Sequence, residues 1–535
     1  MKAKIIQYKI FIFIFFILAI CGCQKYLKEE NPSQVTTDFL YTTSNGLQAA
    51  VTGLYTIERG EVSTNQSNDF AFSMGDAGTD LDFDRAAVPN FAWYRSDVNL
   101  ANESEVKSWW NMWYKIIERT NEIITFGRTA QITDTEKKTI LREAYVYRAY
   151  AYFWLVRKYD NIWLDTIPTT SHNVDGRSFS VAKQSDVYSL IVSDLNTAIQ
   201  YYGSDWTVVP GKFNQGVARL LRADVALWQK DYQTAATQST TIIANGPFSL
   251  VDPTTIFTQD GRDNTKESMY VMQFDQFASG GGSSHSMPLN FSGITGRMPG
   301  CTFASDLGGY GWARIHPNPY FMSLYDQKYD KRYNAYWKNY YTYNNPAFDF
   351  SKLTYHYGDT LKPNQNSLLV GLNFYEYAMP GCKKYWDWVK VPSATASYNN
   401  VYIFRYPQVL LIAAEAYMNL GDNVKALSYI NMIRQSRILS TCPNQLITSM
   451  NQSVLLDEYA RELGFEGQRW FLLKRLGVLI DRIKMYGGVT TFQGVPSPST
   501  NFYLCRTNVQ SYHVRWPIPQ TAIDAMGGFP QNQGY

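Results

Sequence analysis

Two aromatic side chains stand next to each other at Trp93 and Tyr94, shortly after the charged residues Asp80 and Arg85. Indole and phenol rings present a flat apolar face with a polar tip. Sugar rings have apolar C–H faces edged by hydroxyl groups, so they stack on such rings while charged side chains bind the hydroxyls. The segment is therefore a candidate ligand contact, and a place in the core is the alternative for each ring.

A second pair of rings, Tyr310 and Trp312, lies in the stretch GGYGW. The glycines leave these rings less crowded by neighbouring side chains. We predict that this loop and the Trp93 loop meet across one shallow cleft. The candidate ligand contacts are then Trp93, Tyr94, Asp80, Arg85, Tyr310 and Trp312.

Motifs of catalysis are missing from the sequence. The five histidines are scattered, and no HExxH pair would place two metal ligands on one helix face. The stretch Gly281–His285 is the nearest approach to a GxSxG elbow, but it has His where Gly is needed. No phosphate-binding loop is present. We predict no catalytic residue, no metal site and no cofactor, and a surface hydrolase with spatially paired carboxylates remains the distant alternative.

Glu466, Arg469 and Trp470 lie close together in the chain, soon after Arg461 and Glu462. Charged side chains four residues apart on a helix commonly pair. We interpret this group as an ion-pair clasp near a helix end, in preference to a catalytic site.

The first residues resemble a secretion signal. Lysines precede a run from Ile10 to Gly22 that carries no charge, and this run is too short for a membrane-spanning helix, which needs about 20 residues. Ile20-Cys21-Gly22-Cys23 is similar to the lipobox of bacterial lipoproteins. That resemblance implies cleavage after residue 22 and a lipid on Cys23.

Composition indicates a soluble globular body after the signal. Mean hydropathy is −0.29, and the net charge of +3 is too small to suggest a nucleic-acid partner. Aromatic residues make up 16% of the chain, which is compatible with both a ring-rich core and glycan contact. The four remaining cysteines allow three full disulfide pairings, and the sequence does not choose between pairing and free thiols: Cys301, Cys382, Cys442 and Cys505.

The elements that would position these residues are mainly helices. Apolar residues with helical spacing predict helices over about 104–126, 135–159 and 184–202. Two later stretches, at about 217–243 and 406–437, place alanines on both sides of a tight turn, which resembles a tetratricopeptide helix pair. Between 246 and 400, glycines and prolines interrupt every long helix, so we expect a loop-rich lobe with short strands and helices.

Motifs along nearly the whole chain resemble the SusD/RagB family. The most specific lie in the C-terminal part: Arg405-Tyr406, Ala414-Glu415-Ala416, Arg461-Glu462-Leu463, Phe465-Glu466-Gly467, Arg469-Trp470-Phe471, Pro517-Ile518-Pro519 and Gln531–Tyr535. Three positions depart from the family pattern, namely Tyr459, Leu472 and Gln533. They lie in scaffold segments and cast little doubt on the fold.

The resemblance implies a mainly α SusD-like fold on a tetratricopeptide-like scaffold. It also implies a non-catalytic lipoprotein of the outer membrane, facing the cell exterior, that binds an oligosaccharide and delivers it to a TonB-dependent transporter of the SusC kind. A RagB-like peptide-binding import subunit is the alternative. The expected division is 1–22 signal, 23–45 tether and 46–535 SusD-like domain, with scaffold at about 46–245 and 401–480, ligand lobe at 246–400 and C-terminal segment 481–535.

Overall fold

The computed structural model describes residues 37–63, 67–85, 90–170, 173, 176–258, 265–277, 282–365, 369–389 and 391–535. Cys23 and the predicted signal therefore lie outside the described residues. The order of elements is α2 (Thr37–Thr42), α3 (Ser44–Ser63), α4 (Ser67–Met74), β1 (Asp82–Asp84), η1 (Leu100–Asn102), α5 (Ser104–Thr129), α6 (Asp134–Tyr159), α7 (Gln184–Tyr202), α8 (Gln215–Trp228), α9 (Tyr232–Asn245), α10 (Pro253–Ile256), β2 (Ser268–Met272), α12 (Met287–Asn290), η4 (Thr295–Arg297), η5 (Ser305–Leu307), β3 (Ile315–Pro317), α13 (Pro319–Ser323), α14 (Arg332–Ala335), β4 (Trp337–Lys338), α15 (Leu372–Tyr377), β5 (Gly381–Cys382), η6 (Lys383–Tyr385), β6 (Val401–Arg405), α16 (Tyr406–Asn419), α17 (Asn423–Arg437), α18 (Gln452–Leu463), α19 (Arg469–Arg475), α20 (Leu479–Tyr486), β7 (Thr491–Phe492), β8 (Val495–Pro496), η7 (Thr500–Tyr503), α21 (Leu504–Asn508), η8 (Ser511–Val514) and α22 (Gln520–Ala525).

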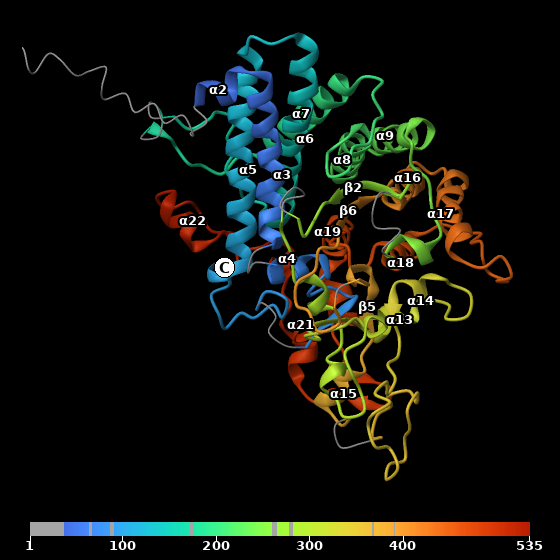
Figure 1. Cartoon of the computed structure of the whole chain (residues 1–535). Helices are drawn as coiled ribbons and strands as arrows, with labels where there is room; N and C mark the ends of the chain where they lie inside the picture. Colours follow the sequence, from blue (N-terminus) through green and yellow to red (C-terminus); the bar gives the residue numbers. More distant parts are fainter. Residues whose placement is uncertain are drawn as a thin grey trace, which may run out of the picture.

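Long helices form the scaffold, as the sequence predicts. Figure 1 shows α3, α5 and α6 side by side, and α6 also packs against α7. The predicted apolar face of α5 is buried, and its Trp109 stacks on Trp154 of α6 with ring centroids 4.6 Å apart. A capping box starts α6, because Thr133 accepts from the Glu136 N–H while the Glu136 carboxylate accepts from the Thr133 N–H.

The two predicted helix pairs are present as α8–α9 and α16–α17, and they pack against each other through α9 and α16. Each second helix begins with an aspartate cap: Asp231 accepts from the Thr234 N–H and Asp422 from the Lys425 N–H. The turn before α17 contains Gly421 at φ +82°, a conformation that glycine adopts without strain. The mainly α fold class is thus confirmed.

The lobe between the helix pairs contains short elements and small two-stranded sheets. Strand β2 pairs antiparallel with β6, so the chain enters and leaves the lobe at one place. Strand β1 pairs with β3, and β4 pairs with β5. In Figure 1 the lobe helices α13, α14 and α15 lie below the scaffold.

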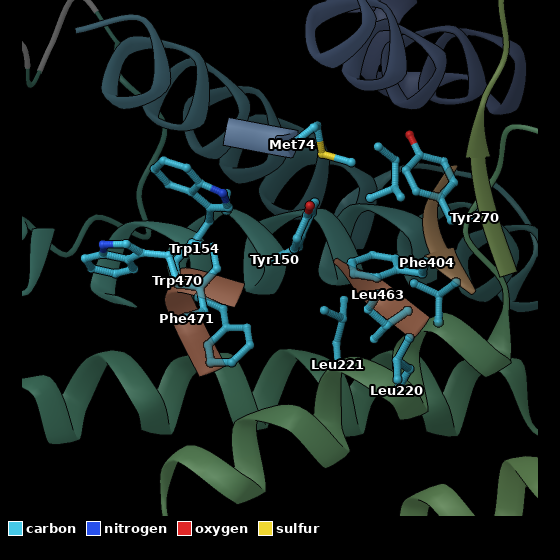
Figure 2. Close-up of a cluster of buried hydrophobic side chains, with 14 of the residues drawn as sticks. Met74, Tyr150, Trp154, Leu220, Leu221, Tyr270, Phe404, Leu463, Trp470 and Phe471 are labelled. Atoms are coloured by element: carbon cyan, nitrogen blue, oxygen red, sulfur yellow. The ribbon is translucent and has the colours of Figure 1, made fainter. Parts of the chain in front are cut away.

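The scaffold and the start of the lobe share a core rich in rings. Figure 2 shows Tyr150 and Trp154 of α6 with Phe404 of β6 and with Trp470 and Phe471 of α19. The ring centroids of Tyr150 and Phe404 are 5.4 Å apart, and those of Trp154 and Phe471 are 6.0 Å apart. Most of the aromatic content of these helices is therefore structural.

Buried charges tie the lobe to the scaffold. The Glu462 carboxylate accepts hydrogen bonds at 3.0–3.1 Å from three guanidinium groups, those of Arg332, Arg405 and Arg437. Arg405 also pairs with Glu466, which pairs with Lys384 at 2.6 Å. We call the buried ion-pair network the set Glu267, Asp330, Arg332, Lys384, Arg405, Arg437, Glu458, Glu462 and Glu466.

The prediction of an ion-pair clasp is confirmed for Glu462 and Glu466, but their partners come from distant segments, and Arg469 pairs with Asp80 instead. Burial acts to raise the pKa of Glu462, but the three guanidinium groups outweigh it and hold that pKa well below its usual range. Glu466 lies beyond the end of α18, so the clasp includes residues from outside the helix.

Cys301, Cys382, Cys442 and Cys505 are all free thiols. Within the described ranges, no group of three or more His, Cys, Asp and Glu side chains is arranged to hold a metal ion. The described part of the chain also has no helix with the length and apolarity needed to cross a membrane.

Candidate functional site

The pairing of β1 with β3 brings two distant loops together. Asp82, Phe83 and Asp84 lie opposite Pro317, His316 and Ile315. The ladder continues past the strands, because the Arg85 N–H donates to the Arg314 carbonyl at 2.8 Å. Arg85 therefore lies beside the segment that carries Tyr310 and Trp312.

Arg85 fixes the position of this segment through hydrogen bonds of its side chain. Its guanidinium pairs with Glu376 at 2.6 Å and donates to the carbonyl groups of Trp312, at 2.9 Å, and Ala313. The side chain is 9% exposed. Burial lowers the pKa of Arg85, and Glu376 opposes that shift. Three of its five guanidinium N–H donors are used on the protein itself, so Arg85 positions the loop.

Trp312 is half-buried and has a cationic neighbour. The Arg314 guanidinium lies 4.3 Å from the centroid of the indole. Ala313, which lies between them, has φ +50°, so the segment is not an extended strand at this point. Burial lowers the pKa of Arg314, and the charge of Arg85 lowers it further. Arg314 has no ion-pair partner among the described residues.

Tyr310 is half-buried and is held in a similar way. Arg297 donates to the Tyr310 hydroxyl and lies 5.3 Å from the ring centroid. The Phe303 ring is 5.2 Å away. Arg297 is exposed and, like Arg314, has no carboxylate partner in the described part of the chain. We call Arg85, Arg297, Tyr310, Trp312, Arg314 and Glu376 the Arg–aromatic surface.

The glycines of this loop act differently from the sequence expectation. They do not simply leave room around the rings, because the backbone itself is closely packed. A Cβ on Gly311 would lie 2.2 Å from the Ser292 carbonyl oxygen, and Gly308 has φ +87°. Glycine is needed here so that the loop can approach the segment around Ser292.

Three of the six predicted contacts lie elsewhere. Asp80 is fully buried, and both of its oxygens accept from Arg469, at 2.8 and 2.7 Å. Burial acts to raise the pKa of Asp80, but Arg469 and Arg482 outweigh it, so this pKa is below its usual value. Because the carboxylate is fully buried, Asp80 does not contact a ligand. Its role is to pair with Arg469 and Arg482 inside the scaffold.

Tyr94 is also interior, with 5% of its surface exposed. Its hydroxyl donates to the Gly78 carbonyl at 2.6 Å, and its ring packs on His513. Trp93 is half-buried, and its carbonyl accepts from Asn508 at 3.0 Å. Within the described ranges, neither residue has a ring contact or hydrogen bond with Tyr310 or Trp312. The structure thus brings together Arg85, Tyr310 and Trp312 only.

Sequence reasoning missed Arg297, Arg314 and Glu376. For Arg314 a signal existed, namely its position only two residues after Trp312 in the sequence. Arg297 and Glu376 gave no signal, because only the tertiary fold brings them near. Together the surface offers two partly exposed rings, a phenol hydroxyl and two cations without an acidic partner. Such groups bind and orient a ligand, but they supply no nucleophile with a partner base.

The model of the SusD family matches residues 266–535, and a second one, described as starch-binding associating with outer membrane, matches residues 25–219. SusD-like protein P2 of Formosa agariphila is 26% identical over 503 residues, which cover 88% of this chain and 90% of that protein.

Two solved structures share the fold. A SusD homologue from Bacteroides thetaiotaomicron has a TM-score of 0.71 at 19% identity, with 92% of this chain and 97% of that chain covered. Surface glycan-binding protein A from Bacteroides thetaiotaomicron, in complex with laminarihexaose, has a TM-score of 0.68 at 19% identity, with 91% and 99% covered.

Proposed function

The chain belongs to the SusD family, and on this premise we propose that it is a non-catalytic surface lipoprotein that binds an oligosaccharide and delivers it to a TonB-dependent outer-membrane transporter of the SusC kind. Similarity to a surface glycan-binding protein solved in complex with laminarihexaose supports a glycan ligand. The family description that mentions the outer membrane supports the location.

The observation that carries the proposal is the pair of partly exposed rings at Tyr310 and Trp312, each with an arginine beside it. A sugar ring stacks on the indole face that Arg314 leaves uncovered. The Arg297 and Arg314 guanidinium groups then donate to sugar hydroxyls, and Arg85 holds the loop in place. Binding here needs no covalent step, which agrees with a protein that passes its ligand on unchanged.

The test is a pair of substitutions with a matched control. Isothermal titration against a panel of oligosaccharides, including laminarihexaose, identifies a ligand. Trp312→Ala is then expected to weaken binding about fivefold to a hundredfold, because aromatic stacking is worth about 1–3 kcal/mol and each ~1.4 kcal/mol is a factor of ten. Tyr357→Ala removes a ring that is 59% exposed and outside the Arg–aromatic surface, so it should bind like wild type. Equal affinity for Trp312→Ala and wild type would place the glycan elsewhere.

A peptide is the alternative cargo. It is favoured by one observation, the two arginines without acidic partners, since guanidinium groups bind carboxylates as fork-like pairs. Acidic peptides in the same titration panel separate the two cases. Peptide binding that disappears in Arg314→Gln, with no oligosaccharide bound, would favour the RagB-like function.

The membrane anchor is tested at Cys23. Cys23→Ser is expected to leave the protein without lipid and off the outer membrane, because several acyl chains are needed for stable anchoring. Cys21→Ser is the matched control and should remain anchored. Native protein whose intact mass shows no lipid on Cys23 would contradict this part of the proposal.

The transporter partner is tested by purification of the native protein in mild detergent. We expect a large TonB-dependent barrel to co-purify. Protease treatment of whole cells, with a known surface protein as a positive control, checks that the lipoprotein faces outward. Elution of the lipoprotein alone, under conditions that preserve other outer-membrane complexes, would count against the partnership.

A further inference from the structure

A hollow of 400 Å³ lies between α10, α14 and η6, and none of its lining residues belongs to the Arg–aromatic surface. Its volume is within the range of about 300–1,000 Å³ that is usual for small-molecule sites. We call it the lysine hollow, after the residues that carry the argument: Phe257, Lys328, Lys331, Asn334, Lys383 and Trp388.

One wall of the lysine hollow is the half-buried indole of Trp388. Its Nε1 donates to the Phe257 carbonyl at 3.1 Å, which fixes the orientation of the ring. The ring also packs on Trp386, with centroids 5.4 Å apart. A fixed, partly exposed indole is a ready stacking surface, because no side-chain freedom is lost when a ligand ring covers it.

The charges around the hollow are positive. Lys328, Lys331 and Lys383 all line it. In the described part of the lining the only carboxylate is that of Asp330, and it pairs with the buried Arg332 at 2.8 Å. Lys331 pairs with Asp252 at 2.5 Å. Among the residues that the structure describes, the lining of the hollow therefore has more cations than acids, and its one acid is already paired.

Lys383 is the most informative of the three. Its Nζ donates to the Asn334 carbonyl at 2.7 Å and lies 5.5 Å from the Trp388 ring centroid. It has no ion-pair partner among the described residues. Burial lowers the pKa of Lys383 to about 8, and the charge of Lys338 contributes. An anion beside Lys383 would offset both effects.

We propose that the lysine hollow is a second ligand site, which takes an anionic sugar unit, carboxylated or sulfated, with its ring on Trp388 and its acid group on Lys383 and Lys328. The stacking face selects a ring, and the Lys383 and Lys328 ammonium groups, for which no ion pair is present among the described residues, select a negative charge on it. The site is independent of the function proposed above, since it shares no residue with the Arg–aromatic surface.

Titration with four probes tests the proposal: trigalacturonate, its neutral match galactotriose, a sulfated galactose disaccharide, and triglutamate. We expect at least one anionic sugar to bind at least tenfold more tightly than galactotriose. Lys383→Gln should weaken that binding about tenfold to a hundredfold, because a hydrogen bond to a charged group contributes about 1.5–3 kcal/mol. Trp388→Ala should weaken it at least tenfold, and Trp388→Phe less.

The matched control is Lys352→Gln, which removes an exposed lysine of the same lobe outside the hollow. It should bind like wild type. The proposal is overturned if galactotriose binds as well as the anionic sugars, if triglutamate alone binds, if no probe binds, or if Lys352→Gln and Lys383→Gln lose affinity equally. Whether the carboxylated or the sulfated probe binds more tightly identifies the acid group.

A measurement on the wild-type protein covers the case in which a variant does not fold. Because its pKa is lowered, Lys383 should react with an amine-directed label faster than Lys352, and the bound anionic sugar should protect it. Mass spectrometry of labelled peptides reads both effects. Labelling of Lys383 that is unchanged by a saturating anionic sugar would overturn the assignment. Trp312 variants test the other site, so failure here leaves the proposed function unaffected.

Discussion

Glu462→Gln is a direct test of the buried ion-pair network. The substitution keeps the shape of the side chain and removes one negative charge. Glu462 and its three partners, Arg332, Arg405 and Arg437, are all fully buried. The buried cluster then has one negative charge fewer to balance its three guanidinium groups. The new amide N–H group also faces guanidinium N–H groups, with which it cannot form a hydrogen bond. Because the scaffold and the lobe both contribute to this cluster, the effect should appear in global unfolding.

The expected loss is about 3–5 kcal/mol, the usual cost of removing one partner of a buried pair. A domain has a total stability of about 5–15 kcal/mol, so the loss is a large fraction of it. Urea unfolding followed by tryptophan fluorescence gives the free energy, and an unchanged slope shows that the native state keeps its compactness. Asp97→Asn, which breaks an exposed pair with Arg95, is the control and should leave the midpoint where it is.

The pH dependence supplies a second check. The pKa of Glu462 is held below its usual value, so its contribution is fully present above about pH 5 and is lost as acid protonates the folded protein. Glutamine has no proton to gain. The difference between wild type and Glu462→Gln should therefore shrink as the pH falls. A variant as stable as Asp97→Asn at pH 7 would refute the view that this network stabilises the fold.

Three further predictions concern single residues. Burial raises the pKa of Asp84 to about 7, so the folded carboxyl is protonated at low pH and stability is lost as the pH rises through 7. In thermal unfolding, Asp84→Asn should be as stable as wild type at pH 4 and more stable at pH 8, by at most ~4 kcal/mol. Equal unfolding midpoints at pH 8 would contradict this. Gly311→Ala should destabilise by about 1–3 kcal/mol, because the new methyl group would overlap the Ser292 carbonyl, whereas Gly53→Ala, with open space around it, should not. A thiol reagent should modify half-buried Cys442 in the native protein but reach Cys382 only after denaturation, since burial raises the pKa of the Cys382 thiol to about 12. Early labelling of Cys382 in a mass-spectrometric time course would show that this part of the core opens.

The helical scaffold could be predicted because its signals are local. Helical spacing located α5, and a turn aspartate before an alanine-bearing helix located α17. Such signals depend on residues a few positions apart. The loop-rich texture of the lobe followed from its glycines and prolines for the same reason.

The site could be predicted only in part, because it depends on contacts between distant segments. Strand β1 has three residues, all buried, and shows no alternation that would reveal its partner. Asp80 resembled a surface acid, and only its pairing with Arg469 and Arg482, which are 389 and 402 positions away, explains its burial. The hollow beside Trp388 and Lys383 could not be predicted, because no nearby residue in the chain indicates it.

The β2–β6 pairing has a consequence for how such a protein diversifies. The chain departs after Met272 and returns at Val401, and the two strands fix these ends side by side. Once the ends of a loop are fixed, the entropy of closing it grows only with the logarithm of its length. Insertions and deletions in the exposed loops between the two strands are therefore inexpensive, provided that they spare the residues of the buried ion-pair network. The exposed loops of the lobe can therefore change in length while Arg332 and Lys384 keep the lobe fixed to the scaffold.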